Sequence, residues 1–407
     1  MSKNKIESST ENLLNFPTLL VLIIMLLLGF GQLQRLQLTN QVAIYGHDFF
    51  IGIFVFWTTL VTSHKIEFLK NSFHRWRYLL WFISWTVLSL ILNQIKSGVT
   101  LIPWLYNFRF WLYLGFGLML NQQLIAKKIS FSVVRAGTFM MFGFIIFIGI
   151  FQYLFIPDLR FLGEGGWDVH YYRMAGNMLD PNFYGMILTL GFLFLFFASK
   201  KCQSRLWIGL LYAFCLALTY SRSSYLVFVG VLTYLLYQTH QLSWQSAKKP
   251  LLFTLVSFCL ILLVLPRPGG LGVQLSRTET IVSRIETNQS VLSEFNWWTL
   301  MVGQGFFTPA INQHQSSIVH AHFPDNILVF LLSASGLPGL YLIGRFAYLE
   351  LKKATKDQAL TKIAILGGLF IHAQFNLTFF EPIVLLITLI CFTQTKATSP
   401  ASLKGKS

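Results

Sequence analysis

Three arginines lie where an apolar chain rarely keeps positive charge. Arg222 lies in L-T-Y-S-R-S-S-Y between two apolar runs that almost touch, Arg173 lies in Y-Y-R-M-A-G shortly before another run, and Arg109 lies inside one. An arginine keeps its proton and binds phosphate oxygens two at a time. An ionisable residue held near or inside a membrane span is a candidate functional residue. We therefore predict that these arginines bind an anion at a membrane surface, and a lipid-linked phosphate or diphosphate fits best.

The segment H-A-H-F-P-D-N contains the best candidates for a general base, just before a later apolar run. His320 and His322 titrate near neutral pH, so either could take a proton from an incoming hydroxyl. Asp325 could do the same if its pKa is raised. Asp325 could also be an ordinary N-cap of the following helix, and the two roles are compatible.

Other polar residues have structural explanations. In D-P-N, Asp180 is expected to cap a helix that starts at Pro181. Asp168 and His170 are expected to be surface residues. The four cysteines follow no CxxC or Cys/His spacing. The sequence therefore predicts no metal and no cofactor.

The composition indicates that apolar, membrane-spanning segments position these residues. The chain has 407 residues, of which 54% are hydrophobic and only 11% charged, and its mean hydropathy is +0.59. Soluble domains carry about 25% charged residues. The net charge of +16 comes largely from lysines in short connections. That distribution indicates membrane topology rather than nucleic-acid binding.

The sequence predicts an all-α, polytopic membrane protein that forms a single membrane domain over residues 1–407. Its apolar runs reach the length that crosses about 30 Å of hydrocarbon. Twelve spans are expected, at about 16–34, 42–62, 78–95, 101–121, 131–156, 182–199, 206–220, 223–238, 250–265, 325–349, 361–375 and 377–394.

The lysines predict the orientation of these spans. They gather in every second connection, which the positive-inside rule assigns to the cytoplasm together with both termini. The polar loops 157–181 and 267–324 then lie outside. A long polar segment in such a protein usually carries function. We expect the segment from Arg267 to Asp325 to cover a cavity whose floor is built by the spans.

The sequence resembles the O-antigen ligase/Wzy-type polymerase family of bacterial membrane glycosyltransferases, which are similar to GT-C enzymes in architecture. The resemblance is spread over most of the chain and rests on the order of four motifs. They are R-x-x-G with D-P-N (Arg173, Gly176, Asp180, Pro181, Asn182), L-T-Y-S-R-S (218–223), G-Q-G-F (303–306) and D-N-I-L-V-F-L-L-S-A-S-G-L-P-G (325–339).

The resemblance implies a donor and a site. The donor would be an undecaprenyl-diphosphate-linked oligosaccharide, used without metal or nucleotide at the outer face of the bacterial cytoplasmic membrane. Arg222 and Arg173 would hold its diphosphate, with Arg284 or Arg277 as a third contact. The family's ligases usually carry a histidine where this chain has Asp325, so either Asp325 is the base or His320 or His322 supplies it.

We expect a polysaccharide polymerase that joins the donor glycan to an acceptor glycan. Membrane lipid and a chain-length regulator protein are the other expected partners. A ligase that transfers glycan to lipid A core or to a protein is the enzymatic alternative. A transporter or flippase of lipid-linked glycan is the non-enzymatic one, although the clear inverted repeats typical of transporters are missing.

Overall fold

The computed structural model describes residues 15–39, 42–61, 65–165, 167–239, 245–266, 268–308, 324–353 and 356–394. Within these ranges the chain forms 14 α-helices and one small antiparallel sheet. The candidate bases His320 and His322, and also Arg267, lie outside the described residues.

Six helical segments of the described chain are long and apolar enough to cross a membrane, which supports a membrane protein. Each contains an 18-residue window of mean hydropathy between 1.5 and 2.3. They are Phe16–Gln34, Trp76–Ser97, Phe131–Phe155, Pro181–Ala198, Ser246–Val264 and Ile327–Lys352. Four further apolar helices are shorter, at Gly46–Val61, Cys202–Ala217, Ala359–His372 and Pro382–Gln394.

Every predicted span overlaps a helix of the structure. The helices are α2 (Phe16–Phe30), α3 (Gly46–Val61), α4 (Lys65–Ser97), α5 (Leu101–Ile125), α6 (Phe131–Phe155), α7 (Pro181–Ala198), α8 (Cys202–Ala217), α9 (Arg222–Gln238), α10 (Gln245–Val264), α13 (Ile327–Lys352), α14 (Lys356–His372) and α15 (Pro382–Gln394). The helical class of the fold is therefore confirmed. Twelve crossings stay a prediction, because six segments of the described residues meet the length and hydropathy that a crossing requires.

The second predicted span begins too early. Residues 42–45 form strand β2 (Val42–Tyr45), which pairs antiparallel with β1 (Arg35–Thr39), and α3 starts only at Gly46. The apolar and polar residues of L-Q-L-T (36–39) alternate, which is typical of a strand, and all four residues are exposed. Asp48 accepts a hydrogen bond from the backbone N–H of Tyr45 at 3.0 Å and fixes the junction between β2 and α3.

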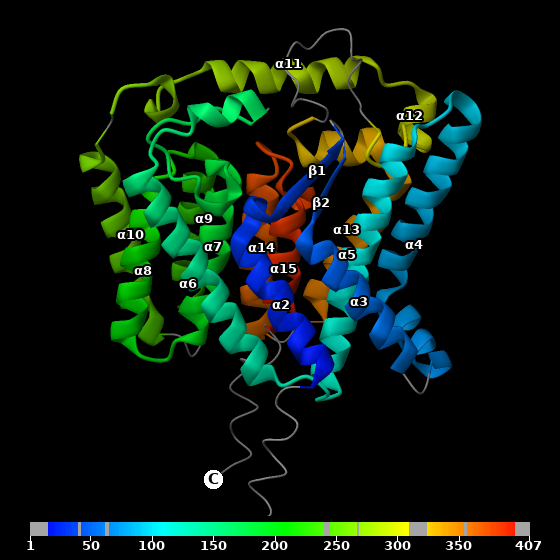
Figure 1. The fold of residues 1–407 in the computed structure, drawn as a ribbon, viewed down its shortest axis with the longest axis horizontal. Coiled ribbons are helices and arrows are strands. Elements are labelled where there is room, and N and C mark those ends of the chain that lie inside the picture. The colour runs from blue at the N-terminus through cyan, green and yellow to red at the C-terminus, as the bar shows by residue number, and fades with distance from the viewer. Residues whose placement is uncertain are drawn as a thin grey trace, which may run out of the picture.

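The long polar segment is more structured than the loop that the sequence predicts. Its described part contains α11 (Glu279–Ser293) and the short α12 (Trp297–Met301), and α11 lies across one end of the helical bundle (Figure 1). Asn296 caps α12 by accepting a hydrogen bond from the backbone N–H of Thr299 at 2.9 Å. The segment therefore places a helix across this end of the bundle.

A break in α13 contacts the residues that follow α12 and holds this part of the polar segment in place. At Gly336 the backbone has φ +64° and ψ −173°, a conformation that only glycine adopts readily. The backbone N–H of Gln304 donates to the carbonyl of Ser333 at 2.8 Å, and a Cβ on Gly303 would lie 2.4 Å from the carbonyl oxygen of Ala334. Two motifs of the family resemblance, G-Q-G-F and S-G-L-P-G, thus pack directly on each other.

Helix packing brings the ends of distant segments together. Helix α14 packs against α9 and α7, and η5 (Thr378–Phe380) follows α14 and contacts it. The first residues of α7 and α9 therefore lie near the last residues of α14, under the end of the bundle that α11 covers (Figure 1).

Candidate functional site

Arg173, Arg222, Arg277 and Arg284 form what we call the arginine cluster. The guanidinium groups of Arg173 and Arg277 both donate to the carbonyl of Tyr220, each at 3.4 Å. Arg222 donates to the carbonyl of Leu275 at 3.2 Å and to that of Arg277. The charge of Arg284 acts on both Arg222 and Arg277. Four positive charges from three separate segments thus lie close together, which makes this region strongly attractive to an anion.

Arg173 is the most buried member of the cluster. Its side chain is 6% exposed and donates from Nε to the carbonyl of Thr219 at 3.0 Å. Burial, and then the charge of Arg277, lower the pKa of Arg173 to about 10, so it remains protonated at neutral pH. Gln152 of α6 holds the following backbone, because its Oε1 accepts from the N–H groups of Ala175 (2.9 Å) and Gly176 (3.1 Å).

The backbone around the cluster adopts conformations that L-residues disfavour. Tyr172, Leu179 and Tyr220 have φ values of +49°, +55° and +50°. Such residues each cost about 1–3 kcal/mol and concentrate at functional sites. Gly176, at φ +54°, allows a close approach, since a Cβ there would lie 2.3 Å from the ring of Tyr184.

Arg284 connects the cluster to the candidate base Asp325. Its Nε lies 3.5 Å from Oδ2 of Asp325, and its Nη2 donates to Oδ1 of Asn376 at 2.8 Å. Burial raises the pKa of Asp325 above the ordinary aspartate value, while the positive charge of Arg284 opposes that rise. The N-cap of α13 is Asn326 rather than Asp325, so the capping role considered for Asp325 is wrong.

A buried polar network continues from Asn376 into the bundle. Asn376 donates to the hydroxyl of Ser223 at 3.1 Å, and that hydroxyl lies 3.3 Å from Nε2 of His372. The same Nε2 lies 3.2 Å from Ser224 Oγ, and Nδ1 lies 2.5 Å from Thr378 Oγ1. The sequence reasoning missed this network. Its only signal was a set of polar residues in otherwise apolar runs, and these come from distant parts of the chain.

The start of α7 is built as the sequence predicts. Asp180 caps the helix, since its Oδ1 accepts from the N–H groups of Asn182 (2.6 Å) and Phe183 (3.1 Å), and Pro181 is the first helical residue. The hydroxyl of Ser221 donates to Oδ1 of Asn182 at 2.8 Å. This contact links the D-P-N motif to the residue before Arg222.

Arg109 belongs to a different set of contacts. It pairs with Asp48, whose Oδ2 lies 3.0 Å from its Nη2, and it lies over the ring of Tyr45 at 5.4 Å. It therefore has the partner expected of an arginine inside a span. The structure does not join it to the arginine cluster through any described contact.

His170 is not the surface residue that the sequence suggests. Its side chain is only 6% exposed, and burial, more than the nearby Arg173, lowers its pKa to about 3. Ligand atoms of Asp168, His170 and Asp180 all lie within 4.8 Å of one another. This is a group of described side chains that could hold a metal ion.

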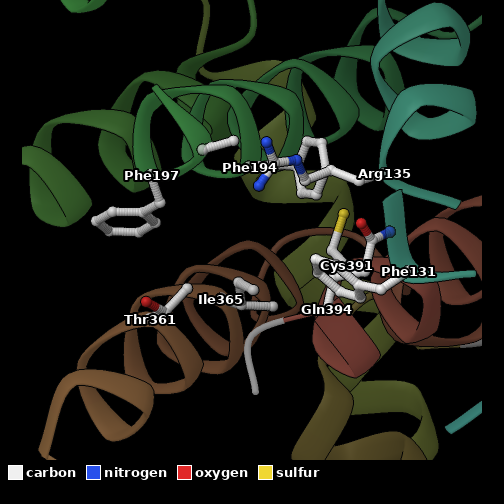
Figure 2. A pocket seen from close by; sticks show the side chains of 9 residues that line it. Phe131, Arg135, Phe194, Phe197, Thr361, Ile365, Cys391 and Gln394 are labelled. Carbon is white, nitrogen blue, oxygen red and sulfur yellow. The ribbon is translucent and has the colours of Figure 1, made fainter. Parts of the chain in front are cut away.

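An apolar pocket lies away from these residues. Figure 2 shows it between the first turns of α6 (Phe131 and Arg135), the first half of α14 (Thr361 and Ile365) and the last turns of α7 and α15. The arginine cluster and Asp325 lie at the opposite ends of α7 and α14, so the pocket is not part of the candidate site.

Neither a model of a known protein family nor a curated protein sequence matches this chain. The geometry of the site must therefore carry the functional argument.

Proposed function

We propose that this protein is a membrane glycosyltransferase of the O-antigen ligase/Wzy polymerase type, acting as a polysaccharide polymerase. In this proposal the helices make twelve crossings of the bacterial cytoplasmic membrane, with both termini in the cytoplasm. The arginine cluster, under α11, then faces outward. The observation that supports this proposal best is the arginine cluster: Arg173 and Arg277 share the carbonyl of Tyr220, and Arg222 donates to the carbonyl of Arg277. Arg284 lies next to Asp325.

The proposed reaction uses these groups in two ways. The acceptor hydroxyl attacks the anomeric carbon of the donor sugar, the bond from that carbon to the diphosphate oxygen breaks, and undecaprenyl diphosphate leaves. Asp325 takes the proton of the hydroxyl, which its raised pKa favours. The arginines stabilise the negative charge that develops on the diphosphate, without a change in their own protonation.

The direct test is a reaction of the purified protein with undecaprenyl-diphosphate-linked repeat units in the absence of ATP. A polymerase extends the glycan into a ladder of longer lipid-linked products. Transfer of one intact glycan to a separate acceptor, without a ladder, would identify a ligase instead. If glycan is moved across the bilayer but never transferred, the enzyme proposal is wrong.

Arg222→Ala tests the diphosphate role. Removing one preorganised charged donor costs about 10²–10³ in rate, so we expect product formation to fall by that factor while the protein remains in the membrane. Arg160→Ala is the matched control, because Arg160 is an exposed arginine of the same predicted outer side, and it contacts Asp158 at 2.6 Å and the ring of Tyr171 rather than the arginine cluster. Equal activity of the two variants would remove Arg222 from the site.

A further inference from the structure

Asp168, His170 and Asp180 lie in the segment that connects α6 to α7, and contacts near both ends of this segment hold it in place. The backbone carbonyl of His170 accepts from the N–H of Leu159 at 2.9 Å, and Asp158 and Tyr171 form an isolated antiparallel bridge. Asp180 is fixed at the N-cap of α7. Three potential ligands, separated by up to twelve positions in the sequence, are thereby held within 4.8 Å.

The buried imidazole of His170 points to a missing ligand. Its Nε2 is buried and has no hydrogen-bond partner among the described residues, although the side chain is only 6% exposed. Burying a polar atom without a partner is unfavourable, so such atoms in a folded protein call for an explanation. Coordination to a cation would provide one.

The two carboxylates complete a donor set suited to a cation. Both cap hydrogen bonds of Asp180 end on Oδ1, so Oδ2 takes part in neither. Asp168 is exposed, and its side chain can rotate to close the ligand separation to the ~3.0–3.4 Å that metal–ligand bonds of about 2.1 Å require. The negative charge of Asp168 also offsets the positive charges of Arg173 and Arg277, which act on the same imidazole.

We propose that Asp168, His170 and Asp180 form a binding site for one divalent transition-metal cation of the Mn²⁺ or Zn²⁺ kind. Imidazole suits Zn²⁺, and carboxylates suit Mn²⁺, whereas Mg²⁺ prefers all-oxygen ligands. Three protein ligands leave coordination positions for water. The site goes beyond the proposed glycosyl transfer, for which the sequence predicts no metal, and it does not depend on that function.

The test is Mn²⁺ binding to the intact protein in detergent, followed by electron paramagnetic resonance. Loss of the free Mn²⁺ signal gives the affinity and stoichiometry, and electron spin echo modulation from nitrogen reports an imidazole ligand directly. We expect one Mn²⁺ per chain with nitrogen modulation, and displacement of that Mn²⁺ by Zn²⁺, which binds such sites more tightly.

Asp168→Asn and His170→Ala should each weaken Mn²⁺ binding by about tenfold or more, since even outer-shell changes cost 10–100-fold. Asp168 is exposed, so its substitution leaves the core intact even if His170→Ala lowers stability. Asp158→Asn is the matched control, because Asp158 lies in the same segment and pairs with Arg160. Absence of stoichiometric Mn²⁺ binding to the wild type, or binding that both variants retain, would overturn the proposal.

Discussion

At the scale of single residues, the contacts of Arg284 and Asp325 define the proposed chemistry. Arg284 contacts both Asp325 and Asn376, so it touches the candidate base and the buried network at once. Asp325 is partly exposed and does not cap α13, because Asn326 does. Its carboxylate is therefore available to a hydroxyl that approaches from the side of α11.

The pH dependence of transfer tests Asp325 as the base. The base acts only when deprotonated, so kcat/KM should fall as the pH decreases through the pKa of Asp325. Because burial raises that pKa, the fall should occur at higher pH than for an ordinary aspartate. Asp325→Asn should lower kcat by about 10²–10⁴ and abolish this acidic limb. If the activity of Asp325→Asn still falls at low pH as that of the wild type does, the titrating base is another group, such as His320 or His322.

At the scale of elements, the broken helix α13 holds the end of the covering segment in place. Trp85 of α4 donates from Nε1 to the carbonyl of Ser335 at 2.7 Å, and Asn93 donates to the carbonyl of Gly303 at 3.0 Å. Irregular backbone inside a membrane protein is tolerated only when other groups satisfy its polar atoms. Side chains of α4 do so here, which couples α4, α12 and α13.

Gly336→Ala tests this coupling. The new Cβ would lie 2.8 Å from the carbonyl oxygen of Leu300, in a backbone conformation that costs a non-glycine residue about 1–3 kcal/mol. We expect a clear drop in the Tm of the purified protein. Gly344→Ala in the same helix is the control, since its Cβ would meet nothing within 4 Å. Equal Tm values for the two variants would contradict the account of the break.

At the scale of the whole molecule, the polar segments gather at one end of the bundle. Helix α11 lies across the end where the arginine cluster, Asp325 and Asn376 meet, and the hairpin of β1 and β2 lies at that end as well (Figure 1). The lysines of the sequence favour the other end as cytoplasmic. The sequence therefore predicts that the end covered by α11 lies outside the cell and the opposite end lies in the cytoplasm.

Labelling of cysteines with a membrane-impermeant maleimide tests the orientation. In a Cys259→Ser background, Ser283→Cys on the exposed face of α11 should react in intact cells. The native Cys202, exposed at the start of α8, should react only after the cells are permeabilised. The reverse pattern would place the arginine cluster in the cytoplasm and would exclude donor binding from the outer side.

The sequence by itself determined the long apolar helices and the start of α7. The length of an apolar helix is a property of one continuous run of residues, and the cap at Asp180 depends on residues two and three positions away.

Only the tertiary structure decided which side chains meet. The contacts between Arg284 and Asn376, and between Ser223 and His372, join segments 92 and 149 residues apart. No local pattern specifies such pairs, because they arise from the packing of α9 against α14 and from the position of α11 across that end of the bundle. The burial of His170 and its approach to Asp168 and Asp180 arise in the same way.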